Sequence, residues 1–155
     1  AALLEVVMRP LILSALVLAL AACDTQPEVA AGPPATTPEP PPAMLGEVDL
    51  NQPLRALGTE PFWGVDVSSG TLILTGVDIP EQRFEADSPE VMGTTAVWRG
   101  ADDRGQELTL TLIATECSDG MSDRLYPLTA RVQTEDRELV GCADLTARVL
   151  SGEGA

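Results

Sequence analysis

The chain has no histidine and no lysine, and only five of its 155 residues are aromatic. Without histidine it lacks the most common general base, and without lysine it cannot use Schiff-base or Ser-Lys chemistry. Catalysis by a pair of carboxylates, as in glycosidases, stays possible. However, a chain with 24 acidic residues contains many carboxylate pairs by chance. We therefore expect a protein that is not an enzyme and that carries no cofactor.

Positive charge is also scarce, since nine arginines face 24 acidic residues and give a net charge of −15. Residues 47–155 alone hold 20 acidic residues and eight arginines, a net charge of −12. Such a surface repels the phosphates of DNA and RNA, so we expect no nucleic-acid partner. A basic protein would be attracted to it.

An apolar run covers residues 11–22, after Arg9 and directly before Cys23. A membrane-spanning helix needs about 20 apolar residues, and extending this run upstream would bring in two charges. A basic residue, a short apolar region and small residues at its end are typical of a secretory signal peptide. We predict a signal peptide over residues 1–22, with Met8 as the true start.

Residues 20–23, Leu-Ala-Ala-Cys, resemble the lipobox of bacterial lipoproteins, in which signal peptidase II cuts before the cysteine. The resemblance implies lipid attachment at Cys23 and a chain anchored to a membrane of the bacterial cell envelope, facing the periplasm. Several acyl chains, each contributing about 0.8 kcal/mol per buried CH₂, make a stable anchor. Asp24 resembles an inner-membrane retention signal whose rule differs between bacterial groups, so inner and outer membrane both stay open.

The stretch that follows is rich in proline, alanine, threonine and glycine and has no apolar period. It cannot bury enough surface to offset its ordering entropy, and its proline clusters favour an extended polyproline II spacer. We predict a lipidated tether over residues 23–46 and a single domain over residues 47–155.

Alternating apolar and polar residues in short segments predict strands throughout this domain. Three hairpins are indicated, formed by residues 62–68 with 71–77, 93–100 with 106–115, and 128–134 with 137–144. One further strand is expected near residues 82–86, and no helical period of useful length is present. The predicted fold class is all-β, a small antiparallel barrel or sandwich with one disulfide.

With Cys23 committed to lipid, Cys117 and Cys142 remain. In an oxidising envelope such a pair is most simply a disulfide. Metal ligation is the rival interpretation, but two cysteines without histidine make a poor zinc site. Closing a loop of about 25 residues would stabilise the fold by on the order of 3 kcal/mol.

Two adjacent aromatics, Phe62 and Trp63, follow Gly58 and Pro61. In a strand they must point to opposite faces. Two interpretations stay open: both are buried, one of them under a loop, which we favour, or one is exposed and stacks on a ligand.

Residues 117–127 form the densest polar stretch of the chain. Ser118 and Asp119 can accept hydrogen bonds from backbone N–H groups two or three residues on, and Gly120 tolerates a positive φ, so a tight turn is expected. Met121 is expected to pack the loop against the barrel. The candidate recognition residues of the chain are Phe62, Trp63, Asp119, Met121, Asp123, Arg124 and Tyr126, with Asp123 and Arg124 pointing to solvent or pairing across the loop.

A cation site is the alternative for this stretch, because Glu116, Asp119 and Asp123 offer hard oxygen ligands. The acidic spacing of an EF-hand loop is absent, so we predict no metal site.

Three motifs together resemble a family of small bacterial envelope lipoproteins, whose members occur alone or beside META domains. They are G-x-E-P-F-W at residues 58–63, C-x-D-G-M-S-D-x-x-Y-P at residues 117–127 and G-C-A at residues 141–143. The resemblance implies export, a Cys117–Cys142 disulfide and a compact β domain. It implies no enzyme activity and no particular small-molecule ligand.

The leading hypothesis is a non-enzymatic, lipid-anchored binding or structural module of the envelope. One alternative is an inhibitor of a basic lysozyme, in which the acidic residues 116–123 enter a cationic cleft. The other is an envelope-stress or metal sensor, by analogy with META domains.

Overall fold

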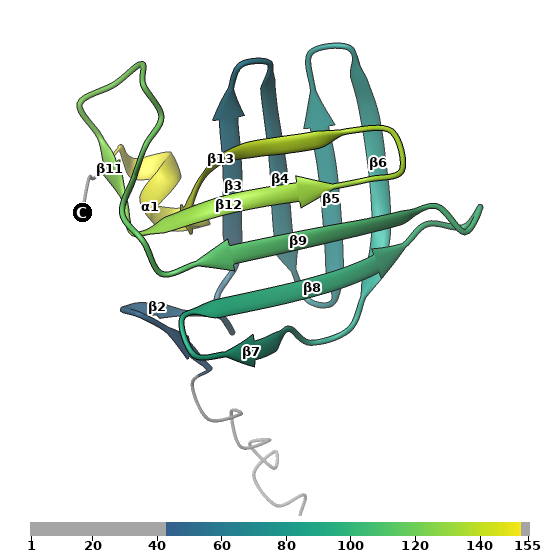
Figure 1. The fold of residues 1–155 in the computed structure, drawn as a ribbon, viewed down its shortest axis with the longest axis horizontal. Coiled ribbons are helices and arrows are strands. Elements are labelled where there is room, and N and C mark those ends of the chain that lie inside the picture. Colours follow the sequence, from purple (N-terminus) through teal and green to yellow (C-terminus); the bar gives the residue numbers. More distant parts are fainter. Residues whose placement is uncertain (1–42, 153–155) are drawn as a thin grey trace, which may run out of the picture. The chain divides into compact units, whose positions relative to one another are not determined.

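The computed structural model describes residues 43–152 (Figure 1). The predicted signal peptide, Cys23 and the tether up to residue 42 lie outside the described residues. The one helix within them is short, and none there could span a bilayer.

Nine strands form one antiparallel sheet in the order β6-β5-β4-β3-β13-β12-β9-β8-β7. β6 also pairs with β8, so eight of these strands close into a barrel, as the sequence predicts. In Figure 1, β3 to β6 run across the direction of β8, β9, β12 and β13, which gives the barrel two crossing layers. The strands are β3 (Leu54–Thr59), β4 (Phe62–Ser68), β5 (Thr71–Gly76), β6 (Ile79–Ala86), β7 (Glu90–Met92), β8 (Thr95–Ala101), β9 (Glu107–Ile113), β12 (Leu128–Gln133) and β13 (Glu138–Leu145).

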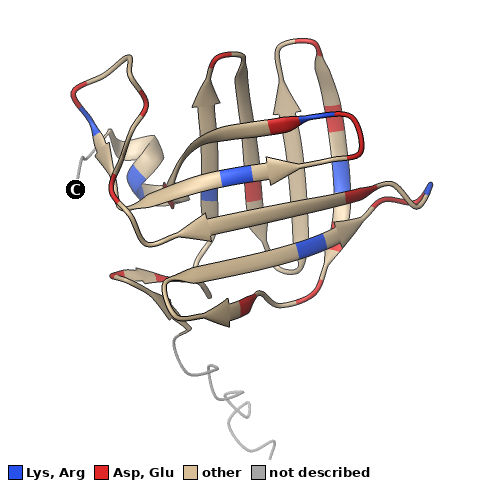
Figure 2. Ribbon diagram, in the orientation of Figure 1, with Lys and Arg blue, Asp and Glu red and all other residues tan. Residues whose placement is uncertain are grey.

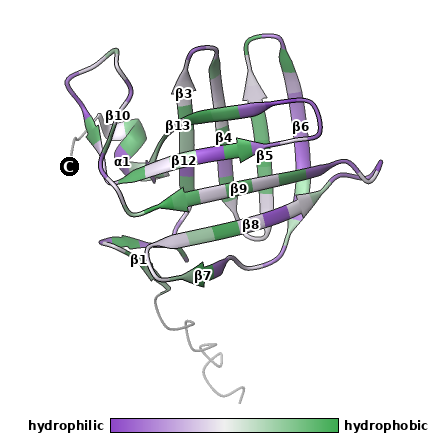
Figure 3. Ribbon diagram, in the orientation of Figure 1, coloured by the Kyte–Doolittle hydropathy of each residue, from purple (hydrophilic) through white to green (hydrophobic). Residues whose placement is uncertain are grey.

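The alternation of each strand decides which side chains enter the barrel. In β9 the three leucines point inward and are fully buried, whereas the threonines between them face outward. Figure 3 shows this alternation as bands of different hydropathy along the strands. The largest fully buried side chains are Leu45, Val48, Leu54, Val65, Leu72, Leu74, Phe84, Leu108, Leu110, Leu112, Leu128 and Val132.

A small hairpin of β1 (Met44–Leu45) and β2 (Val48–Asp49) precedes the barrel. Leu45 and Val48 are completely buried and belong to the same core as the barrel strands. The ordered domain therefore begins before residue 47, where the sequence places its start. Two-residue strands are too short to show a period, so this segment reads as the end of the tether.

All three predicted hairpins are present, as β4–β5, β8–β9 and β12–β13. The strand expected near residues 82–86 is the second half of β6. The prediction missed β3, β7 and the helix α1 (Thr146–Ser151), which ends at Gly152 with a φ of 73°. Six residues cannot show a helical period, so α1 had no sequence signal.

Candidate functional site

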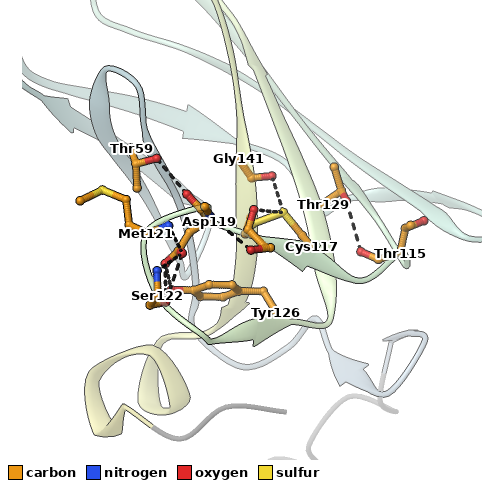
Figure 4. The surroundings of a disulfide bond; sticks show 12 residues. Thr59, Thr115, Cys117, Asp119, Met121, Ser122, Tyr126, Thr129 and Gly141 are labelled. Carbon is orange, nitrogen blue, oxygen red and sulfur yellow. Dashed lines mark hydrogen bonds between the residues drawn. A yellow bond between two sulfur atoms is a disulfide. The ribbon is translucent and has the colours of Figure 1, made fainter.

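Residues 117–126, called the disulfide loop below, lie on the outer face of the barrel beside β13 (Figure 4). The two ends of the loop pair as β10 (Cys117–Ser118) and β11 (Leu125–Tyr126). Cys117 is bonded to Cys142 on β13, with their Cα atoms 5.5 Å apart, which confirms the predicted disulfide. The Thr59 hydroxyl donates to the Asp119 carbonyl oxygen at 3.0 Å, so the hairpin of β3 and β4 holds the loop from the other side.

The turn inside the loop is organised by Asp119. Its Oδ1 accepts the backbone N–H groups of Met121 at 3.0 Å and Ser122 at 2.9 Å. Gly120 has a φ of 72° and donates its N–H to the Ser118 hydroxyl at 3.2 Å. The predicted turn chemistry is therefore confirmed. These backbone N–H groups stabilise the ionised carboxylate and hold the pKa of Asp119 below its usual value.

Tyr126 is buried beneath the loop and donates its hydroxyl to Asp119 Oδ2 at 3.3 Å. Burial raises the pKa of the Tyr126 phenol, and the negative charge of Asp119 raises it further. Tyr126 supports the loop from within and, at 5% exposure, offers little surface for recognition.

Arg124 was expected to point to solvent or to pair across the loop; it does not point to solvent, and its ion pair is with Asp144 of β13. Its guanidinium lies over the Tyr126 ring, 4.7 Å from the centroid, and Nη1 donates to the Val149 carbonyl oxygen at 3.2 Å. Nη2 lies 3.6 Å from Oδ2 of Asp144, and the Arg124 side chain is 11% exposed. The loop is thereby tied to both β13 and α1.

The sequence analysis missed Asp144, whose side chain is completely buried although it points away from the barrel interior. Its Oδ1 accepts the N–H of Leu145 at 2.7 Å and lies 3.5 Å from Nη1 of Arg148. With Arg124 on Oδ2, one carboxylate joins the loop, β13 and α1. The available signal was an acidic residue at an outward strand position, two residues after a cysteine. By itself this pattern indicates an ordinary solvent-facing acid.

The aromatic pair divides between the two faces of β4. Trp63 is 5% exposed inside the barrel, and Phe62 is 52% exposed outside it. The favoured interpretation, that both are buried, is therefore wrong for Phe62. Trp63 belongs to the core, so its ring is not available at the surface as a recognition residue.

Two glycines explain how the indole of Trp63 fits. A Cβ placed on Gly58 would collide with the indole nitrogen, and one on Gly141 would collide with the Leu57 carbonyl and approach the ring. The first and third motifs of the sequence are thus brought together around one side chain.

The exposed apolar side chains at this end of the barrel include Phe62, Met121 at 68% and Val140 at 55%. Met121 therefore does not pack against the barrel as expected, because polar bonds and the disulfide already fix the loop. Met121 and Val140 line a groove of about 350 Å³ between the loop, β13 and the turn of the β3–β4 hairpin, with Thr59 and Ser118 on its walls. We call Phe62, Met121 and Val140 the apolar rim.

The acidic residues in the loop and directly before it differ in their surroundings. The carboxylate of Asp119 is engaged by four groups of the loop itself, whereas Glu116 and Asp123 are exposed. Within residues 43–152, no group of three or more His, Cys, Asp or Glu side chains is placed to hold a metal ion.

No family model, no curated protein and no solved structure matches this chain.

Proposed function

We propose that this chain is a non-enzymatic, protein-binding module of the bacterial cell envelope, anchored to a membrane by lipid on Cys23. In this proposal its recognition surface is the apolar rim beside the disulfide loop. The single observation that carries it is the contrast between two parts of the loop. Its backbone is held by the disulfide, hydrogen bonds and an ion pair, whereas the Met121 side chain is exposed.

The bracing of the loop supports a role in recognition. A disulfide, the turn around Asp119 and the Arg124–Asp144 pair all fix its backbone. A surface that is already ordered loses little conformational entropy when a partner binds, which favours affinity. Met121 adds an adaptable apolar side chain to this rigid support.

The composition of the rim also favours a protein partner. Exposed apolar side chains gathered beside a groove mark interaction sites more often than scattered ones do. Aromatic residues and methionine are enriched at the centres of protein interfaces, and Phe62 and Met121 are of these types. The predicted anchor and tether would place this surface in the periplasm at a distance from the membrane.

The proposal is tested by crosslinking from defined positions in the native envelope. The photoreactive residue p-benzoylphenylalanine is placed at position 62 or 121 of the full chain, or at position 92 as a control. Met92 is 62% exposed and lies on β7, far from the loop in the sheet order. We expect one common crosslinked partner from positions 62 and 121, none from position 92, and loss of the product from position 62 when Met121→Glu is added.

Equal crosslinking from all three positions would contradict the proposal, because the rim would then be no different from other exposed surface. A hydrolase activity of the purified chain that a single carboxylate substitution abolishes would overturn its non-enzymatic part.

A further inference from the structure

On the other side of the barrel, β6 has a strand edge that is not covered. Within the described residues, β6 pairs with β8 only at Glu85 and Ala86, opposite Ala101 and Gly100. Its other neighbour, β5, lies on the opposite side of the strand. Residues 79–84 of β6, called the open edge below, therefore have a sheet neighbour on one side only.

The backbone groups that this edge presents follow from the alternation of an antiparallel strand. Ala86 donates its N–H to Gly70, on the β5 side. Successive residues direct their N–H and C=O groups to alternate sides, so Glu85 and Arg83 direct theirs away from β5. Glu85 faces Ala101 of β8, whereas Arg83 lies beyond the last pair with β8.

Two hollows lie along this edge. One, of about 530 Å³, separates residues 81–85 from the turn between β8 and β9. The other, of about 210 Å³, lies between Phe84, Glu107 and the turn between β12 and β13. Gln82 and Gln106 line both hollows, so the two are adjacent along β6. There is room beside the edge for an added strand.

Acidic residues outnumber basic ones around these hollows. Figure 2 shows acidic residues on β6, at the start of β9 and in the turn between β12 and β13. Asp136 accepts from Arg137 and Thr134, which lower its pKa to about 2 and keep it ionised at neutral pH. The residues lining the two hollows include seven acids and two arginines: Glu81, Glu85, Asp102, Asp103, Glu107, Glu135 and Asp136, with Arg83 and Arg104.

We propose that the open edge of β6 binds an extended segment of a partner protein that carries lysine or arginine and adds to the sheet as a strand. Main-chain hydrogen bonds provide the general affinity in this mode of recognition, and side chains provide the specificity. The acidic surroundings select a basic segment.

The same charge argues against two other occupants. A second copy of this chain would bring an identical acidic rim to the contact, and like charges repel. The preceding residues 24–42 contain no arginine or lysine and are rich in proline, which lacks the N–H that a strand must donate.

The test uses the full, lipidated chain in detergent and a fluorescent octapeptide of alternating lysine and valine, with binding followed by anisotropy. One control peptide carries N-methyl groups on every second backbone nitrogen, which keeps its charge but prevents strand pairing. A second control replaces lysine by glutamate. We expect the N-methylated peptide to bind about tenfold more weakly than the parent, because it loses main-chain hydrogen bonds. The glutamate peptide should show no binding.

Two substitutions at position 83 separate the contribution of the backbone N–H to peptide binding from that of the side-chain charge. Arg83→Pro removes the outward N–H, and Arg83→Ala keeps it while removing the same positive charge. We expect Arg83→Ala to bind the peptide at least as tightly as the wild type, and Arg83→Pro to bind about tenfold more weakly than Arg83→Ala. Equal affinity of the two variants, or of the parent and N-methylated peptides, would overturn strand addition.

Two further measurements complete the test. If Arg83→Pro does not fold, as judged by near-ultraviolet circular dichroism, the Arg83 amide of the wild type is followed by hydrogen exchange. Protection on adding peptide supports the proposal, and unchanged exchange overturns it. A wild-type dimer that Arg83→Pro dissociates would assign the edge to a second copy instead. Met121→Glu should leave peptide binding unchanged, so this result is independent of the apolar rim.

Discussion

The barrel has two junctions between its crossing layers, and they are built very differently. At the junction of β13 with β3, pairing runs from Cys142 to Leu145, and the disulfide loop and α1 lie against these strands. At the junction of β6 with β8, pairing stops after Glu85 and Ala86, and hollows lined by charged residues follow. We refer to them as the covered junction and the open junction.

The covered junction shows how an outward position on a strand can become part of a second core. Asp144 and Cys142 point away from the barrel interior, yet both are buried because the loop and the helix cover them. The open junction lacks such a cover, so its strand edge carries charged side chains and Pro80, which natural proteins use to prevent unspecific strand pairing. The covered junction thus holds the disulfide and a buried ion pair, whereas the strand edge at the open junction is accessible.

The largest expected effect comes from removing the buried carboxylate of the covered junction. Asp144→Ala should lower the free energy of unfolding by about 3–5 kcal/mol, because it leaves the Arg124 guanidinium buried without its counter-charge. Urea denaturation measures the loss. Asp66→Ala is the matched control: Asp66 lies 2.7 Å from Arg55, but both side chains are about one-third exposed, so its loss should stay below about 1 kcal/mol. Equal losses would show that burial of the pair does not matter.

The next effect concerns the disulfide. Cys117→Ala and Cys142→Ala should each lower the free energy of unfolding by about 3 kcal/mol, since each removes the same closed loop of the unfolded chain. The double variant should cost little more than either single one. Denaturation of all three under identical oxidising conditions gives the comparison. Additive losses would contradict a shared bond.

A smaller effect is expected at the turn around Asp119. The pKa of this carboxyl is depressed in the folded state, so its stabilising contribution is complete above the unfolded pKa of about 4 and is lost as the pH falls through the folded pKa. Asp119→Asn should therefore cost about 1 kcal/mol at neutral pH and progressively less in acid. Urea denaturation as a function of pH measures this.

The same variant has a second readout that a general loss of stability would not produce. Tyr126 is the only tyrosine of the chain, so its ionisation can be followed by ultraviolet absorbance. Because the negative charge of Asp119 raises the pKa of Tyr126, Asp119→Asn should shift the titration to lower pH. An unchanged titration would show that the two side chains do not interact.

The smallest effect is a local one at the open junction, with no change in global stability. The Arg83 amide should exchange with deuterium at least about tenfold faster than the Phe84 amide, because Phe84 directs its backbone groups toward β5. Amide-resolved nuclear magnetic resonance makes the comparison within one strand. Similar protection of the two amides would mean that the edge is covered.

The sequence predicts the local parts of this fold well. Alternation and turn residues are enough for the three hairpins, and the spacing of Ser118, Asp119 and Gly120 is enough for the turn in the loop, because both depend on neighbouring residues. The pairing of Cys117 with Cys142 is predicted from the number of cysteines together with the expectation of an oxidising compartment.

Features that depend on distant segments could not be predicted. Alternation places Phe62 and Trp63 on opposite faces but does not say which is inside; Gly58 and Gly141, on two other strands, decide this by leaving room for the indole. Asp144 reads as exposed because its strand position faces outward, and the loop that buries it lies about 20 residues earlier. The open edge of β6 becomes evident only when the register with β8 is known.

The disulfide also sets how far this chain can be stretched. It joins residues 25 positions apart, and the ring so closed contains β10, β11, β12 and the first part of β13. Force applied to the two ends of the chain is transmitted through the disulfide, so residues 118–141 are not extended. An extended chain spans about 3.3–3.6 Å per residue, and the bridge itself spans 5.5 Å between the two Cα atoms. At full extension the oxidised protein is therefore shorter than the reduced one by about 75–85 Å. β12 and the part of β13 up to Cys142 are therefore the part of the barrel that tension along the backbone cannot extend.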